Sequence, residues 1–502
     1  MDDRRPDPIA VLTSLPLQPA YAALGEPYVT PVPTTPLPTP QLLHVNPALA
    51  AELGIDNATL ASNEFVDIMA GNRVWPGYAP LSSVYGGHQF GVWVPRLGDG
   101  RAHLIAEIAT AAGQRRELQL KGSGPTPYSR FADGRAVLRS SIREYLCSEA
   151  MHALGIPTTR ALALVGSPQP VRRETIETAA VVCRVAPSLV RFGHFEYFYY
   201  RNEHAQLAPL ADHVINENFP EFAHAEHRHA AWLGEVIART ARLMAAWQAV
   251  GFCHGVMNTD NFSVLGLTLD YGPYGFIDAF DAHHICNHTD EGGRYAYDQQ
   301  PTIGHWNCSR LLQATLPLLS DTPERAVELA TEILDRYPAI YAQAMTRAWR
   351  GKLGLRESRA EDRELINRYL SILDRGHSDL TRSFRNLAQV RGNDAGPTLG
   401  VREEIADLER FDAWIDDYRA RLRGEQSDDA ERSARMNAVN PKYVLRNHLA
   451  QAAIEAAQGG DYSEIARLFT LLQKPFDEQP EYAVYAAEPP ASARHIEVSC
   501  SS

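Results

Sequence analysis

The sequence predicts an α+β fold in which a strand-rich part precedes a mainly helical part. Segments 102–110 and 116–122 alternate like half-buried strands, and the Gly-containing turn between them indicates a hairpin. Segment 133–155 repeats apolar residues at helical spacing, and segment 179–186 is predicted to be a further strand. From about 195 to 430 the periodicity is mostly helical. These three observations predict a small α+β lobe followed by a helical lobe.

The chain has 502 residues, which is too many for one ordinary core, so several subdomains are expected. Segment 30–40 holds five prolines and is expected to run as an extended strap. The polar segment 423–437 is predicted to be a linker, and a pair of helices is expected over 441–473. The expected domains are an N-terminal extension (1–75), a strand-rich lobe (76–194), a helical lobe (195–430) and a C-terminal helical extension with a tail (431–502).

Composition excludes several classes of partner. The formal net charge of −13 opposes extended contact with nucleic acid or anionic lipid, although a local basic pocket for a nucleotide remains compatible with it. No run of about 18 apolar residues is present, so no membrane span is predicted. The first residues lack the apolar core of a signal peptide, and a cytoplasmic location is the default expectation. The six cysteines include no C-x-x-C pair and are expected to be reduced thiols.

One histidine-rich stretch could suggest a metal centre. It contains His283, His284, Cys286 and His288. This spacing matches no usual zinc pattern, and no second pair of ligands lies at a suitable distance in the chain. A structural zinc site is therefore not expected.

The stretch 254–261, "HGVMNTDN", is similar to a phosphotransferase catalytic loop of the form H-R-D-x-x-x-x-N. His254 and Asn261 fall at the required separation, but Val256 stands where the catalytic Asp is expected. An Asp is present instead at position 260, directly before the Asn. The loop therefore indicates either an inactive kinase or an enzyme with a different reaction.

Other chemistry-bearing residues precede and follow this loop in a telling order. Along the chain there follow a Gly-x-Gly turn, a lysine at a strand end, a glutamate on the predicted helix, the loop asparagine and an aspartate in D-Y-G. Each alone is a weak signal, since most such turns are ordinary hairpins and most such charges are solvated. Together they match the arrangement with which kinases neutralise a nucleoside triphosphate and its metal ion. The residues are Gly98, Gly100, Lys121, Glu144, Asn261 and Asp270.

The departures from the kinase pattern are equally informative. The glycine turn carries Asp99 and Arg101, where kinases place small or apolar residues over the phosphates. An Asp in that place is expected to repel a triphosphate bound in the usual orientation. The metal-binding pair is intact, but the usual catalytic base is missing.

Several stretches carry a dense resemblance to one family. "YGGHQFGVWVPRLGDGRA", "LKGSGPTPYSRFADGRAVLRSSIREYL", "RVAPSLVRFGHFE", "HGVMNTDNFSVLGLTLDYGPYGFID" and "NPKYVLRNHLAQ" resemble the selenoprotein O (SelO) family from about residue 75 onward. The resemblance implies a two-lobed, protein-kinase-like fold with N- and C-terminal extensions, formerly classed as a pseudokinase. It also implies that ATP binds in an inverted orientation and that AMP is transferred to Ser, Thr or Tyr hydroxyls of proteins with Mg²⁺ or Mn²⁺. The sequence leaves open whether UTP can replace ATP.

The resemblance also implies a role for each motif residue. Asp260 would be the proton acceptor, Asn261 and Asp270 would hold the metal ion, and Glu144 would position Lys121. The implied nucleotide-binding residues are Gly98, Gly100, Arg101, Lys121, Asp133, Gly134, Arg184, Arg191 and Asp270.

Two other functions remain open from the residues alone, namely an ATP-dependent kinase and a non-catalytic nucleotide-binding scaffold. The absence of Asp at position 256 argues against the kinase. Retention of the full set of phosphate and metal residues argues against the scaffold. Without the resemblance, Arg184 would be read as a structural ion-pair partner.

Cys500 stands close to the end of the chain, where some members of the resembled family carry selenocysteine, which implies a redox role. Cys286 follows Asp270 in the region where a kinase has its activation loop. We therefore hypothesise a reversible Cys286–Cys500 disulfide that forms under oxidative stress and limits access of the substrate.

Overall fold

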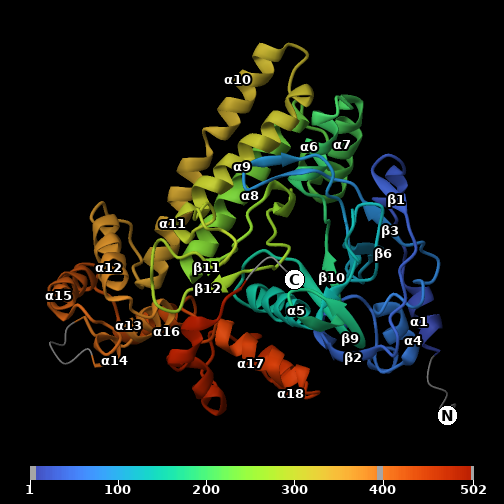
Figure 1. Ribbon diagram of the computed structural model, residues 1–502. Coiled ribbons are helices and arrows are strands. Elements are labelled where there is room, and N and C mark those ends of the chain that lie inside the picture. The colour runs from blue at the N-terminus through green and yellow to red at the C-terminus, as the bar shows by residue number, and fades with distance from the viewer. Residues whose placement is uncertain (1–6, 393–398, 499–502) are drawn as a thin grey trace.

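The computed structural model describes residues 7–392 and 399–498, and it confirms the mixed α/β class. Its main sheet is antiparallel, with the strand order β1-β3-β6-β7-β10-β9-β2 and a short strand β8 paired to β10. Figure 1 shows the strands of this sheet on one side of the molecule and most of the helices on the other. The strands are β1 (Val29–Pro31), β2 (Gln41–Val45), β3 (Leu81–Ser83), β6 (Ala102–Ala109), β7 (Arg115–Lys121), β8 (Ala136–Val137), β9 (Arg160–Arg172) and β10 (Ile176–Ala186).

The predicted hairpin is β6–β7, and the predicted strand at 179–186 is the second half of the longer strand β10. The predicted helix at 133–155 is α5 (Leu138–Ala153), which begins later than expected. The reason is that Ala136 and Val137 pair with β10 as strand β8, and a strand cannot also be the first turn of a helix. Helix α5 packs on β9 and β10 and also against α17 (Asn447–Gln458) and α18 (Ser463–Leu472).

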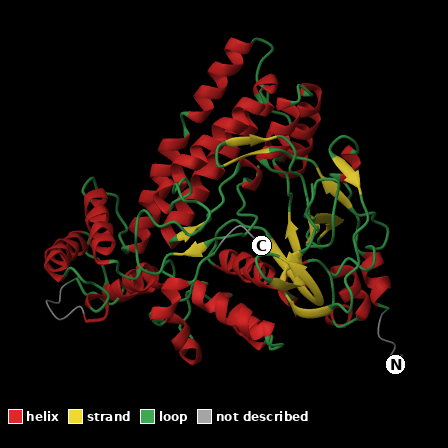
Figure 2. Cartoon of the chain, viewed as in Figure 1, coloured by secondary structure: helices red, strands yellow, loops and turns green. Residues whose placement is uncertain are grey.

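The helices outside the sheet surround α8 (Arg228–Val250), whose apolar stripe is fully buried and which ends at the left-handed Gly251. Figure 2 shows this group as the large red bundle. The other helices of this part are α6 (Phe192–Tyr200), α7 (Leu207–Asn218), α9 (Gln300–Ala314), α10 (Pro323–Leu334) and α11 (Tyr337–Lys352). The N-terminal helices are α1 (Pro8–Ser14), α2 (Pro47–Glu52), α3 (Asn57–Leu60) and α4 (Asn63–Met69).

A second, smaller hydrophobic core lies under the helices that follow α11. The prediction of a linker at 423–437 was wrong, because α15 runs to Gly424 and residues 429–437 form helix α16. Arg432 is fully buried there and donates to the backbone oxygen of Val390, while Met436 packs into the core. The helices of this region are α12 (Asp362–Gly376), α13 (Leu380–Leu387), α14 (Leu399–Arg402), α15 (Leu408–Gly424) and α16 (Asp429–Asn437).

A two-stranded hairpin, β4 (Gly87–Gln89) and β5 (Val92–Val94), leaves the main sheet and reaches the helices. Its two turn residues, Phe90 and Gly91, both have positive φ angles of 49° and 83°, which suits the tight turn of a hairpin. The hairpin contacts α6 and the 3₁₀ turn Thr259–Asn261 (η4), and it is the blue pair of strands beside α6 and α9 in Figure 1. A short ladder of β11 (Phe252–Cys253) and β12 (Gly275–Phe276) flanks the loop that contains this turn. None of the described helices is long and apolar enough to cross a bilayer.

Candidate active site

A cleft of about 570 Å³ lies where the main sheet, the β4–β5 hairpin and the loops after α8 meet. This cleft is lined by all but one of the residues that were implied to bind the nucleotide or the metal ion or to accept the proton. These residues come from distant parts of the chain. The exception is Glu144, which lies buried behind Lys121. The lining residues from that set are Gly98, Gly100, Arg101, Lys121, Asp133, Gly134, Arg184, Arg191, Asp260, Asn261 and Asp270.

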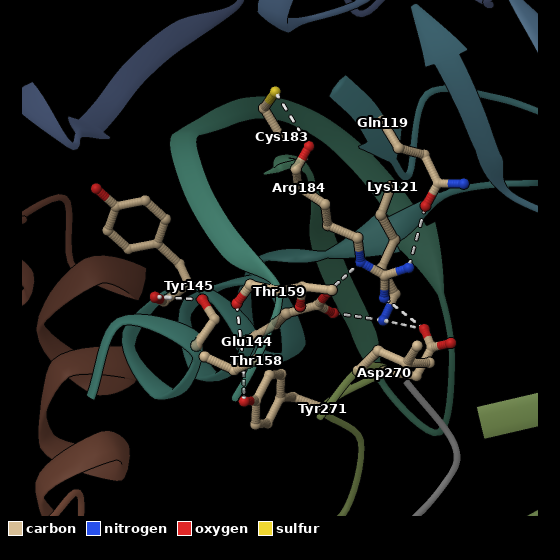
Figure 3. Close-up of polar contacts among 12 residues, drawn as sticks. Gln119, Lys121, Glu144, Tyr145, Thr158, Thr159, Cys183, Arg184, Asp270 and Tyr271 are labelled. Atoms are coloured by element: carbon tan, nitrogen blue, oxygen red, sulfur yellow. Dashed lines mark hydrogen bonds and ion pairs between the residues drawn. The ribbon is translucent and has the colours of Figure 1, made fainter. Parts of the chain in front are cut away.

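A buried ion-pair network forms the floor of the cleft (Figure 3). Lys121 at the end of β7 donates from Nζ to Glu144 Oε2 of α5 at 2.5 Å. The other oxygen of Glu144 accepts from Nε of Arg184, which β10 places beside Lys121. Burial would raise the pKa of Glu144, but the charges of Arg184 and Lys121 lower it below its ordinary value. The helix glutamate is therefore held ionised between two cations.

Asp270 closes this network from the opposite side. Oδ1 accepts from Nη2 of Arg184 and lies 3.8 Å from Lys121 Nζ, while Oδ2 accepts from Nη1 of Arg191. Burial opposes the ionised form, yet the charges of Arg184, Arg191 and Lys121 hold the pKa of Asp270 well below its usual range. A positive φ of 58° turns this residue towards the three cations. Asp270 is therefore a carboxylate at any physiological pH.

Asp260 in turn η4 has the opposite environment. Its Oδ2 meets only the Nε2 group of Gln89, at 3.4 Å, and its Oδ1 is buried without a hydrogen-bond partner among the residues that the structure describes. Burial raises the pKa of Asp260 to about 7, and the nearby charge of Arg191 only partly opposes this. A carboxyl group with such a pKa can take up and release a proton near neutral pH.

The donor set at the cleft fits a hard divalent ion. Nδ2 of Asn261 donates to the backbone oxygen of Val256 at 3.0 Å, so its amide oxygen is the atom left for another partner. Asp270 supplies carboxylate oxygens on the same cleft. Mg²⁺ commonly binds one or two such oxygens together with substrate phosphates. The described residues hold no group of three or more His, Cys, Asp or Glu side chains placed to bind a metal ion.

The acid in the glycine turn lines the cleft but is held by neighbouring strands. Asp99 is buried, and its carboxylate accepts from the Ser83 N–H at 3.0 Å and from Gln119 Nε2 at 3.2 Å. Burial raises the pKa of Asp99, and the charge of Arg191 opposes this. Gly98 has a φ of 67°, and a Cβ atom there would lie 2.4 Å from the Tyr128 ring, so the turn requires glycine.

The other end of the cleft is formed by the loop before β8 and the turn between β9 and β10. Arg173 in that turn pairs with both carboxylate oxygens of Asp133 at 2.8 and 3.0 Å. Gly134 has a φ of 69° and packs on the backbone of Gly124 and Pro125. Arg101 also lines the cleft, and burial lowers its pKa while the charges of Glu144 and Asp270 oppose this.

Three cleft residues were missed at the sequence level. Gln89 contacts Asp260, and Arg173 pairs with Asp133. Cζ of Arg191 lies over the ring of Tyr85, 4.9 Å from its centroid. Gln89 and Tyr85 belong to the resembling stretch "YGGHQFG", which was the only signal available. Arg173 lies in a polar turn that carried none.

Two histidines of the motifs make contacts that support the local structure. Nε2 of His254 contacts the backbone oxygen of Leu269 at 3.0 Å, and His88 pairs with the buried Glu196 at 2.6 Å. Cys286 is buried, with Sγ 3.0 Å from the backbone oxygen of Pro273. Cys500 lies outside the described residues, so the proposed disulfide stays a prediction.

Comparison with known proteins decides the family. The family model described as protein adenylyltransferase SelO matches residues 11–473. The chain belongs to this family. It is 63% identical over 492 residues to a protein nucleotidyltransferase YdiU from Methylococcus capsulatus, with 98% of this chain and 97% of the relative covered. It is 55% identical over 509 residues to the YdiU protein of Burkholderia pseudomallei strain K96243, with 99% and 97% covered.

The match confirms the resemblance drawn from the motifs and, with it, the class of enzyme. A protein nucleotidyltransferase needs a site for a nucleoside triphosphate, and the cleft is lined by seven cationic side chains together with Asn261 and Asp270. The roles of the individual residues rest on the geometry described above and are argued next.

Proposed function

We propose that the protein transfers AMP from ATP to Ser, Thr or Tyr hydroxyls of other proteins and releases pyrophosphate, with UMP transfer from UTP as a further possibility. The observation that carries this proposal is the pairing of an ionised Asp270 among arginines with an Asp260 whose pKa lies near 7. The first suits a metal ion and phosphates, and the second suits proton transfer from a hydroxyl. The proposed substrates are ATP with Mg²⁺ or Mn²⁺ and a protein acceptor.

The sheet part with α5 corresponds in this proposal to the first lobe of a kinase-like fold, residues 76–194, and the helices to the second, residues 195–430. The cleft between sheet and helices supports that division, as does the Lys121–Glu144 pair that joins β7 to α5. The segments 1–75 and 431–502 are proposed as extensions that cover the sheet and α5.

The distribution of charge in the cleft supports an orientation for the triphosphate. Lys121, Arg184 and Arg191 lie together around Asp270 with Arg101 close by, and Asp133 and Gly134 line another part of the cleft. In an inverted nucleotide, the α-phosphate faces the acceptor hydroxyl and the β- and γ-phosphates leave as pyrophosphate. Arginines that neutralise the charge developing on the leaving group lower the barrier of this step.

The chain's own groups can then carry out the transfer. Asn261 and Asp270 would hold the metal ion, which supplies charge neutralisation for the phosphates when bound. Asp260 accepts the proton of the acceptor hydroxyl, whose oxygen forms a bond to the α-phosphorus as the α–β phosphoanhydride bond breaks. Its Oδ1, which has no hydrogen-bond partner among the described residues, is available for that proton.

Labelled ATP distinguishes this function from its alternatives. Incubation of the enzyme and a protein mixture with Mg²⁺ or Mn²⁺ should label protein from [α-³²P]ATP and not from [γ-³²P]ATP. Label from the γ position would instead indicate a kinase. Retained ATP binding with no label from either position would indicate a nucleotide-binding scaffold.

We further propose that a Cys286–Cys500 disulfide limits access to the cleft under oxidation. The backbone N–H of His288 donates to Val498 O at 2.9 Å, which places the chain before Cys500 beside the segment that holds Cys286. Peptide mapping after mild oxidation should find this pair, and dithiothreitol should raise transfer in the wild type but not in Cys500→Ala. An equal response of both proteins would contradict the redox role.

A further inference from the structure

The tip of the β4–β5 hairpin is exposed beside the proposed base. Gln89 contacts Asp260, while the next residues carry apolar side chains into solvent: Phe90 is 39% exposed and Val92 is 68% exposed. The N–H of Phe90 donates to the hydroxyl of Tyr295 at 2.9 Å, which fixes the tip against the segment after α8. The hairpin tip therefore lies next to the group that would accept the proton of an acceptor hydroxyl.

Arg294 lies directly under the tip. Its guanidinium packs against Gly91, where an added Cβ atom would lie 3.2 Å from Cζ. It also stacks over Trp306 of α9, with Cζ 4.9 Å from the ring centroid, and its Nε is buried without a hydrogen-bond partner among the described residues. Packing on aromatic rings explains where this side chain lies but leaves its charge without an anionic partner.

Arg310, on the same helix as Trp306, repeats this arrangement. Its Cζ lies 5.2 Å from the centroid of Trp306, and its Nε and Nη2 contact the hydroxyl of Ser309 at 3.3 Å. Its side chain also interacts with the hydroxyl of Tyr200. Within residues 7–392 and 399–498, no carboxylate lies within ion-pair distance of Arg294 or Arg310. Two half-buried cations therefore share one aromatic ring.

The neighbouring carboxylates are engaged elsewhere. Asp290 accepts from the backbone N–H groups of Arg294 and Tyr295, and Oε1 of Glu196 pairs with His88. Oε2 of Glu196 has no hydrogen-bond partner among the described residues. The chain has a formal net charge of −13, yet Arg294 and Arg310 beside the hairpin tip have no carboxylate partner among the described residues. An acidic partner would supply the missing charge.

We propose that Arg294, Trp306, Arg310 and the hairpin tip form a docking surface for an acidic segment of the protein acceptor. The two guanidinium groups pair with Asp or Glu side chains that flank the acceptor hydroxyl, and Phe90 and Val92 contact the apolar parts of the segment. This inference rests on the proposed transfer to proteins and names the chemistry that selects among them. Acceptor hydroxyls in acidic surroundings are modified in preference to those in neutral ones.

Binding of two labelled peptides tests the surface without requiring transfer. One fluorescent peptide has two Glu on each side of a central Tyr, and the other has Gln at those four positions. With the nucleotide cleft filled by an ATP analogue that cannot be cleaved between the α- and β-phosphates, the acidic peptide should bind roughly fivefold more tightly. The preference should shrink as salt is raised.

The double variant Arg294→Gln/Arg310→Gln should bind both peptides equally and keep the wild-type affinity for ATP. The variant Arg294→Lys/Arg310→Lys should retain part of the preference, because it keeps the charge. Arg325→Gln, which removes one positive charge on α10, should behave as wild type. Equal binding of the two peptides to the wild type, or a preference that survives the double Gln variant, would overturn the proposal.

Transfer to the same peptides gives a second measurement. The double Gln variant should show a raised KM for the acidic peptide and an unchanged KM for ATP. Absence of a peptide preference in the wild type, with α-label transfer intact, would refute the docking surface alone. Absence of α-label transfer to any protein would refute the proposed function instead, whatever the peptides do.

Discussion

Asp260 and Asp270 stand close together in the chain and line the same cleft, yet the protein gives them opposite acidities. Asp270 is surrounded by Lys121, Arg184 and Arg191, and its pKa falls well below the usual range. Asp260 has one weak contact from Gln89, and burial raises its pKa to about 7. Both are largely enclosed, so burial alone does not decide their state.

The difference teaches which carboxylate can exchange a proton. Burial disfavours charge on both residues, and only the cations reverse this for Asp270. Pairs of titratable groups whose surroundings move their pKa values apart reveal which is the proton carrier and which the permanent charge. Substitutions at or beside these two residues, and changes of pH, should alter the difference between Asp260 and Asp270.

Removal of the permanent charge should have the largest effect. We expect Asp270→Ala to reduce AMP transfer by more than about a thousandfold, because a metal contribution of several kcal/mol is lost. Added Mg²⁺ should raise ATP affinity in the wild type but not in the variant. Calorimetry with and without Mg²⁺ checks this, and a metal effect that persists in Asp270→Ala would contradict the assignment.

Replacing the proton acceptor should separate binding from turnover. We expect Asp260→Asn to lower the rate of transfer by roughly a hundred- to a thousandfold, since general bases contribute about that much. ATP affinity should stay close to that of the wild type, because Asp260 acts on the hydroxyl. A comparable loss of ATP affinity in Asp260→Asn and Asp270→Ala would show that the two carboxylates share one role.

A single methyl group should disturb Asp260 without changing any charge. A Cβ atom at Gly87 would lie 2.5 Å from Asp260 Oδ1. A strain of about 2 kcal/mol, typical of overpacking, corresponds to a loss of roughly thirtyfold in Gly87→Ala. Gly113→Ala meets no atom within 4 Å and serves as a control for a glycine substitution, although its φ of 74° adds local strain. Wild-type turnover in Gly87→Ala would show that the position of Asp260 is not critical.

The pH profile should show the smallest, graded effect. Asp260 is active as the ionised base, so kcat/KM should rise as pH increases through about 7 and be about one tenth of its maximum one unit below. Burial lowers the pKa of Lys121 to about 8, so loss of its positive charge should lower kcat/KM as pH rises above that value. A profile flat from pH 5 to 7 would contradict the assignment of Asp260.

Much of the fold followed from local patterns. The β6–β7 hairpin and α5 were predicted because alternation and helical spacing are properties of short segments. Helix α16 was missed because its segment is polar, and burial of Arg432 against Val390 O becomes visible only in three dimensions. Strand β9, which pairs with both β10 and β2, likewise carried no clear alternation.

The sequence by itself determined the family and the identities of the motif residues, because the order of glycines, Lys121, Glu144, Asn261 and Asp270 is written along the chain. Tertiary structure alone decided their chemical states. It held Asp99 by hydrogen bonds from Ser83 and Gln119 and gathered Arg184 and Arg191 around Asp270. Among the described residues, it left Oδ1 of Asp260 without a hydrogen-bond partner and Arg294 and Arg310 without a carboxylate partner. The physical reason is that a pKa and an unmatched charge depend on burial and on neighbours distant in sequence, which no local pattern encodes.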